Sequence, residues 1–148
     1  MPQVTTTIDI DAPAARVWDI LTDFAAYPSW NPFIRSIAGT QKAGATLSVT
    51  VQPSGGSPMT FKPRLLVCEV PSELRWKGQV LMPGIFDGEH SFQLSPLGPG
   101  RVQFAHGEVF TGILAGLIFR GGLRRSTERG FVEMNEALKQ RAESAHDA

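Results

Sequence analysis

An excess of charge of one sign, cysteine and long apolar runs are all missing from this 148-residue chain, and each absence excludes a class of protein. The 14 Lys and Arg residues balance the 14 Asp and Glu residues, so no basic field for nucleic acid or an anionic membrane exists. Cys68 is the only cysteine, which excludes an internal disulfide, and no CxxC or Cys/His spacing indicates zinc. The longest apolar stretch, around residues 113–119, is too short to span a bilayer.

What the chain does contain is an ordinary globular composition, with 42% hydrophobic and 19% charged residues. Its length fits one domain with one core. The lone cysteine favours a reducing compartment, and residues 1–7 are polar, without the basic-then-apolar pattern of a signal peptide. We therefore expect one cytoplasmic domain over residues 1–143, with a frayed tail at 144–148.

The first third of the chain predicts a strand followed by two short helices. Residues 4–10 alternate between apolar and polar side chains, as a half-buried strand does. Asp11-Ala12-Pro13 indicates a helix start, with Asp11 or Ala12 as the cap, and apolar residues follow at helical spacing as far as Phe24. Because prolines 28 and 32 disfavour helix in the residues before them, residues 23–33 are expected to form a second short helix or a compact turn.

The middle and the end of the chain predict six more strands and a long helix. Residues 34–111 keep a period of two, and Phe61 to Val70 is expected to be one long strand. The expected turns and breaks lie at Gly39-Thr40, 53–58, Pro71-Ser72, Met82-Pro83-Gly84 and 98–100. After Gly112 the period becomes 3.6, and one apolar stripe predicts a long helix over 114–138. Its four glycines indicate close packing, a bend or a mobile first half.

This order of elements predicts an α+β fold in which a curved, seven-stranded antiparallel sheet wraps around the C-terminal helix. A sheet of that length coils instead of staying flat. One helix cannot fill the whole concave side, so we expect a largely apolar cavity between the sheet and the helix.

Several segments resemble the START-like superfamily, also called SRPBCC or polyketide cyclase/dehydrase-like. The segments that carry the resemblance are Ala12 to Phe24, Tyr27 to Phe33, Leu74 to Gly78, Glu89 to Phe92, Phe104 to Gly112 and Gly130 to Leu138. The resemblance implies a helix-grip fold with a deep cavity for apolar or amphipathic small molecules. Members include lipid, sterol and hormone binders, aromatic polyketide cyclases, coenzyme-Q-binding proteins and oxygenase domains. With three histidines and no cluster like the iron triad of the oxygenases, this chain resembles that branch least.

The residues best suited to chemistry are His106 and Glu108, which lie two apart in a predicted strand and so point the same way. Apolar residues share that face, which indicates that it is turned inward. A hairpin turning at 98–100 would bring His90 near His106 or Glu108. His106 and Glu108 can tune each other's pKa and act as acid and base. They can also be a buried polar pair satisfied by each other, by Arg64 or by backbone, or the strand end can face solvent at the mouth of the cavity. Two histidines and a glutamate can bind zinc, but the family does not generally use a metal there, so no metal or cofactor is expected.

Three functions fit these observations. The first is binding or carriage of a small hydrophobic or amphipathic molecule, without catalysis. The alternative is a polyketide cyclase or dehydratase in which His106 is the base and Glu108 orients it, which requires both to reach open cavity. The third is an interaction module without a ligand, with a homodimer through the glycine-broken start of the last helix as one form. The predicted ligand contacts are Trp30, Trp76, His90, Phe92, Phe104, His106, Glu108, Phe110 and Phe119.

Neither nucleic acid nor stable membrane insertion is expected. The arginines at 120, 124, 125 and 129 form a solvated face, a rim that attracts an anionic ligand, or an edge that touches a membrane, helped by Leu114, Leu117, Ile118 and Phe119.

Overall fold

The computed structural model describes residues 2–80 and 84–144, and it confirms the predicted α+β fold class with an antiparallel sheet and a long C-terminal helix. The predicted break at Met82-Pro83 and the tail at 145–148 lie outside the described residues. In order, the elements are β1 (Gln3–Ile10), α1 (Ala14–Thr22), the 3₁₀ turn η1 (Phe24–Ala26), α2 (Tyr27–Trp30), β2 (Ile34–Ala38), β3 (Ser48–Val51), β4 (Met59–Phe61), β5 (Arg64–Glu69), β6 (Glu73–Val80), β7 (Phe86–Gly98), β8 (Arg101–Thr111), α3 (Ala115–Ile118) and α4 (Gly122–Ala142).

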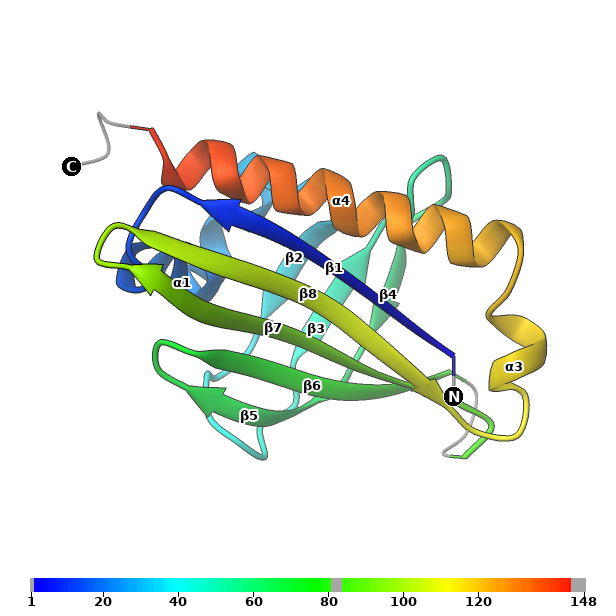
Figure 1. Ribbon diagram of the computed structural model, residues 1–148. Coiled ribbons are helices and arrows are strands. Elements are labelled where there is room, and N and C mark those ends of the chain that lie inside the picture. The colour runs from blue at the N-terminus through cyan, green and yellow to red at the C-terminus, as the bar shows by residue number, and fades with distance from the viewer. Residues whose placement is uncertain (1, 81–83, 145–148) are drawn as a thin grey trace.

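The strands form two antiparallel sheets that lie one behind the other (Figure 1). The larger sheet has the order β1-β8-β7-β6-β5, and the smaller has the order β2-β3-β4. Helix α4 runs along the β1 edge of the larger sheet (Figure 1). The two sheets are joined where the Leu47 amide donates to the Pro63 carbonyl and the Leu65 amide donates to the Ala45 carbonyl. The predicted short helices after the first strand are α1 and the η1–α2 pair.

The described residues contain eight strands instead of the seven predicted. The difference lies in the run from Phe61 to Val70, which was expected to be one strand. Lys62-Pro63 divides it into the end of β4 and the start of β5, because Pro63 has no amide hydrogen for a sheet ladder. Strands on either side of such a break are free to join different sheets.

The predicted continuous helix over 114–138 is also divided, into α3 and α4. The break falls at Phe119–Gly121, where Gly121 adopts a φ of +58° that few other residues tolerate. Gly130 shows the close packing that the glycines indicated, since a Cβ there would overlap the ring of Phe33. Helix α1 likewise begins slightly later than predicted, with Pro13 as its N-cap.

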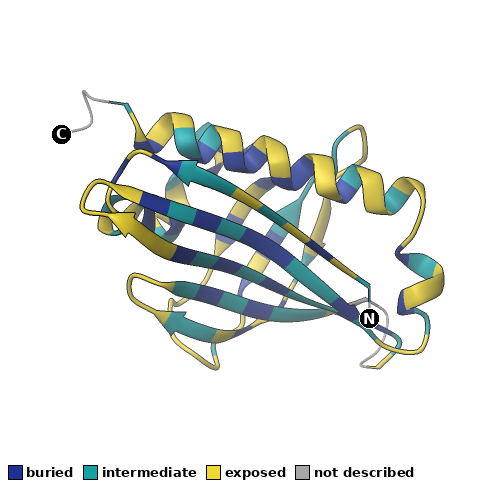
Figure 2. Ribbon diagram, viewed as in Figure 1, coloured by how far each residue is buried: buried dark blue, intermediate teal, exposed yellow. Residues whose placement is uncertain are grey.

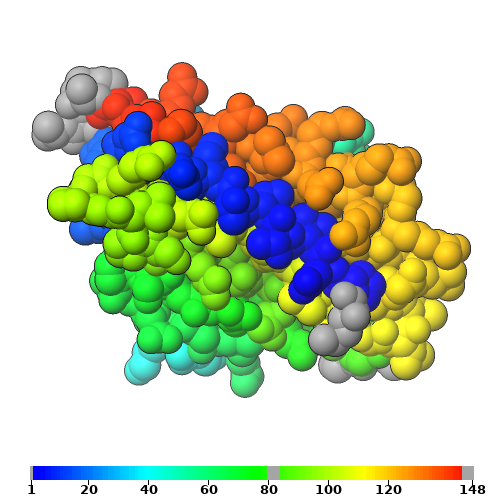
Figure 3. All heavy atoms as spheres, viewed as in Figure 1, coloured from blue at the N-terminus to red at the C-terminus, as the bar shows by residue number. Residues whose placement is uncertain are grey.

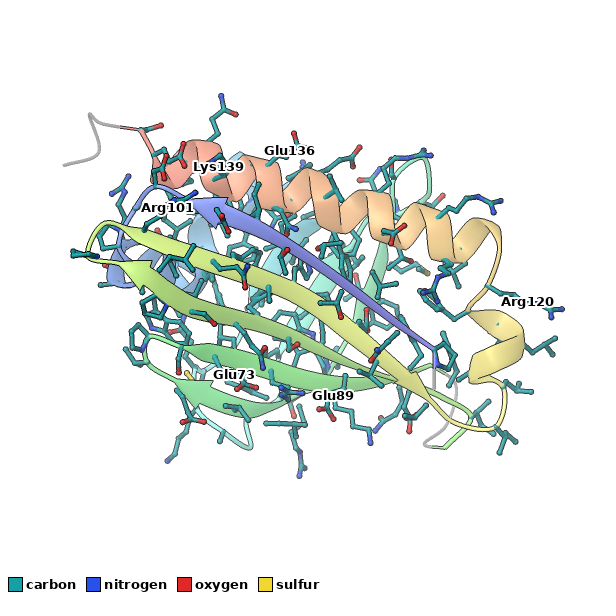
Figure 4. The ribbon with its side chains drawn as sticks, viewed as in Figure 1. Glu73, Glu89, Arg101, Arg120, Glu136 and Lys139 are labelled. Atoms are coloured by element: carbon teal, nitrogen blue, oxygen red, sulfur yellow. The ribbon has the colours of Figure 1, made fainter. Side chains whose placement is uncertain are left out.

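Buried residues alternate with partly buried ones along β7 and β8, so one face of the larger sheet is turned inward (Figure 2). The outer face carries a cluster of ion pairs: Arg75 pairs with Glu73 at 2.6 Å and with Glu89 at 2.9 Å, and both glutamates project from this face (Figure 4). Figure 3 shows the atoms of β1 lying directly against those of α4. Among the described residues, no helix is long and apolar enough to cross a membrane.

Candidate functional site

A cavity of about 370 Å³ lies between the two sheets, with α3 and α4 contributing to its wall. Most of the side chains that line it are apolar, and the polar ones are Gln79, His90, Glu108 and Thr127. The lining consists of Phe33, Ile34, Val49, Val51, Pro53, Met59, Phe61, Pro63, Trp76, Gly78, Gln79, Phe86, Gly88, His90, Glu108, Phe110, Ile118, Phe119, Leu123 and Thr127. Its volume lies at the lower end of the range usual for small-molecule sites.

The turn before β2 positions two residues of the cavity wall, Phe33 and Ile34. Asn31 is buried, and its Oδ1 accepts hydrogen bonds from the amides of Phe33 at 2.9 Å and Ile34 at 2.8 Å. An asparagine that bonds the backbone two and three residues ahead is a common turn device. Here it fixes the start of β2, so that Phe33 and Ile34 face the cavity.

Strands β7 and β8 bring the three polar residues together. Their register places His90 opposite Glu108, and Phe92 opposite His106. His90 Nδ1 lies 3.3 Å from Glu108 Oε1, and His90 Nε2 lies 2.8 Å from His106 Nε2. His90 therefore stands between the two residues of β8, which interact through it.

The chain of hydrogen bonds continues into α4 and β1. His106 Nδ1 lies 2.9 Å from Asn135 Oδ1, and Asn135 Nδ2 donates to Thr6 Oγ1 at 2.8 Å. The Thr6 hydroxyl in turn lies 3.3 Å from the carbonyl oxygen of His106. Four elements are thus connected by one polar path that begins at the cavity wall and ends at β1.

Aromatic rings surround this polar path. The His106 ring stacks on Phe131 with centroids 3.9 Å apart, and the His90 ring stacks on Trp76 at 5.0 Å. Burial lowers the pKa of His106 well below its ordinary value, and the adjacent His90 lowers it further. His106 is therefore held as a neutral imidazole.

The predicted ligand contacts fall into three places. Trp76, His90, Glu108, Phe110 and Phe119 line the cavity. Phe92, Phe104 and His106 are buried in the core and do not belong to the described lining. Trp30 lies at a different depression, beside α1 and the end of α4. Contact of any of these residues with a ligand stays a prediction.

Several residues of the site were missed by reasoning from the sequence. Asn135 lies beside Phe131, Met134 and Leu138 on the buried side of α4, and a polar residue within an apolar stripe is a signal that could have been used. The contributions of β2, β3 and β4 to the cavity wall carry no comparable signal, because they depend on how the smaller sheet faces the larger one.

The two histidines are arranged for hydrogen bonding to each other. Their Nε2 atoms are 2.8 Å apart, whereas two nitrogen ligands of one tetrahedral zinc, each about 2.0–2.1 Å from the metal, lie farther apart. No group of three His, Cys, Asp or Glu residues in the described part of the chain could hold a metal ion.

Comparison with solved structures shows the same fold. The Zhui aromatase/cyclase from Streptomyces sp. R1128 is 19% identical, with a TM-score of 0.75 over 96% of this chain and 93% of that chain. A START superfamily protein from Mycobacterium smegmatis is 20% identical, with a TM-score of 0.73 over 95% of this chain and 97% of that chain. The di-domain ARO/CYC BexL from the BE-7585A biosynthetic pathway is 18% identical, with a TM-score of 0.71 over 97% of this chain and 50% of that chain. At these identities the likeness concerns the fold alone.

A comparison with the curated proteins gave no match. The family model described as polyketide cyclase / dehydrase and lipid transport matches residues 1–143. That match covers nearly the whole chain and agrees with the two sheets, the long final helix and the cavity between them. The chain therefore belongs to the polyketide cyclase/dehydrase and lipid transport family.

Proposed function

We propose that this protein binds and carries a small hydrophobic or amphipathic molecule in the cavity between its sheets. The observation that carries the proposal is the chemistry of the wall, where, among the described residues, sixteen apolar residues or glycines surround four polar side chains. Removing apolar surface from water contributes about 25 cal/mol per Å², so such a wall favours an apolar guest. The volume of about 370 Å³ fits a compact molecule of a few rings better than a lipid with two long chains.

Catalysis by His106 is the weaker alternative. A base in a cyclase must come within hydrogen-bonding distance of the substrate proton that it removes. His106 is fully buried between Phe131 and the sheet, and both of its ring nitrogens already have partners. Only Glu108 and His90 of the polar path lie at the cavity wall.

Displacement of a neutral fluorescent probe tests the proposal. N-phenyl-1-naphthylamine brightens in an apolar environment, and we expect saturable binding with one probe per chain. Compact aromatic and terpenoid compounds are then expected to displace it. A wild-type protein that takes up neither the probe nor any member of such a panel would refute the proposed function.

A pair of glycine substitutions locates the binding. Gly78→Leu adds a side chain to a residue of β6 that lines the cavity, and it is expected to weaken probe binding about tenfold or more. Gly98→Leu adds the same side chain at an exposed position at the end of β7, where a Cβ has open space. Equal loss of binding in both variants would place the probe somewhere other than this cavity.

A further inference from the structure

The direction of each hydrogen bond in the polar path can be deduced by starting at Thr6, where the path ends in β1. The Thr6 hydroxyl has one hydrogen, which it donates to the carbonyl oxygen of His106, so its oxygen must accept from the Asn135 amide. Asn135 Oδ1 therefore faces His106 and accepts from Nδ1. Since His106 is neutral, its Nε2 carries a lone pair and no hydrogen.

This assignment determines the state of His90. The hydrogen between the two histidines must belong to His90 Nε2, because His106 Nε2 can only accept. His90 Nδ1 then faces Glu108 Oε1, and one further proton must lie between these two atoms for them to form a hydrogen bond. The His90–Glu108 pair holds that proton either as an imidazolium beside a carboxylate or as a neutral imidazole beside a carboxylic acid.

In both forms the second oxygen of Glu108 remains an acceptor. Glu108 lines the cavity, and within the described residues its Oε2 has no hydrogen-bond partner. Oε2 lies over Gly88, where a Cβ would overlap it, so the absence of a side chain at Gly88 leaves room for this carboxylate position. The cavity wall thus presents a lone pair that a guest can use.

The rest of the described lining offers an anion neutral donors at Gln79 and Thr127 but no cation. Of the described residues that line the cavity, none is a lysine or an arginine. If His90 is charged, its two N–H groups are both engaged, one with His106 and one with Glu108. A carboxylate guest would therefore place its charge beside an acceptor in an apolar site without a free cation, which is costly.

From this arrangement we infer that Glu108 selects guests that carry a neutral hydrogen-bond donor, such as a phenol or an alcohol, over carboxylates of the same skeleton. The inference rests on the proposed binding function and adds the chemical class of the guest. Glu108 acts as a specificity-determining residue, and the path through His90, His106 and Asn135 holds it in place.

Three naphthalenes with the same ring system test the inference at pH 7, where 2-naphthol is neutral and 2-naphthoate is charged. Titration calorimetry is expected to show 2-naphthol binding about tenfold or more tighter than 2-methoxynaphthalene, because the ether cannot donate the hydrogen bond to Glu108. 2-Naphthoate is expected to bind more weakly than the ether.

Variants at Glu108, with one exposed position as the control, test the role of the carboxylate. Glu108→Leu removes the acceptor and is expected to bring the ratio of naphthol to ether affinity close to one. Glu108→Gln can donate from its amide to His90 and keep its oxygen toward the cavity, so part of the preference is expected to survive. Gly98→Leu changes an exposed position outside the cavity and is expected to leave the ratio unchanged.

Two further outcomes separate this inference from the proposed function. If the wild type binds all three compounds equally, or binds naphthoate best, the selection by Glu108 is wrong while the binding function stands. If the wild type binds none of them and no neutral probe either, both are wrong. Nitrogen NMR of the wild-type histidines gives a test that needs no variant: His106 must carry its hydrogen on Nδ1, and a hydrogen on Nε2 would overturn the assignment.

Discussion

Replacing His106 with glutamine is expected to make the stability of the protein less sensitive to acid. His106 is buried as a neutral imidazole, and burial lowers its pKa below the ordinary value of 6.5 that applies in the unfolded chain. The contribution of the neutral His106 side chain to the free energy of unfolding is fully present above pH 6.5. The contribution is lost as the pH falls below 6.5, because the unfolded state then binds a proton that the folded state does not accept.

The size of the effect follows from one proton. Between pH 7.5 and pH 5.5 this linkage removes up to about 1.4 kcal/mol from the free energy of unfolding of the wild type. Glutamine does not titrate, and its amide can still accept from His90 and donate to Asn135. As the pH falls from 7.5 to 5.5, the difference in unfolding free energy between wild type and His106→Gln is therefore expected to shrink by up to about 1.4 kcal/mol.

Urea unfolding at several pH values measures this difference directly, because groups that titrate alike in both proteins cancel. Parallel stability curves for the two proteins would show that His106 takes up its proton equally in the folded and unfolded states. That result would refute the argument that burial keeps His106 neutral, and with it the direction of the hydrogen bonds that leads to Glu108.

Two other predictions concern the packing around the site. Gly130→Ala is expected to lower the free energy of unfolding by about 1–3 kcal/mol, because the new Cβ meets the ring of Phe33. Gly116→Ala in α3 has open space and is expected to cause no such loss. Urea unfolding of both variants checks this, and an equal loss of stability in the two would contradict it. Tyr27, the only tyrosine, is buried and donates to the Leu21 carbonyl at 2.7 Å, and burial raises its pKa. An alkaline absorbance titration is therefore expected to show tyrosinate only as the chain unfolds, with stability falling above pH 10, and ionisation of the native protein near pH 10 would contradict it.

The pattern of apolar residues predicts most of the fold because a period of two or of 3.6 reports directly which side of an element is buried. It predicts the breaks less well. The apolar run from Phe61 to Val70 continues through Pro63, yet the missing amide ends the ladder there. The stripe after Gly112 likewise continues through Gly121, although the backbone at that glycine leaves the helical region.

The candidate site could be predicted from the sequence only in part. His106 and Glu108 do point the same way, but residues two apart on one strand are separated by about 7 Å, whereas directly opposed residues on neighbouring strands lie within about 5.5 Å. The partner of Glu108 is therefore His90, which the register places opposite it. Which residue of α4 meets His106 depends on how the helix lies along the sheet, and the period alone does not determine that.

The same polar path also explains why the helix lies where it does. Apolar contacts along α4 are non-directional, so they specify its position along the sheet only through fit, as where Gly130 meets the ring of Phe33. The bond from His106 to Asn135 and the bond from Asn135 to Thr6 exist at only one position of the helix, and a shift would leave buried polar groups without partners. The arrangement that orients Glu108 at the cavity wall therefore also specifies the position of α4, so a substitution at Asn135 is expected to alter ligand selectivity and helix packing together.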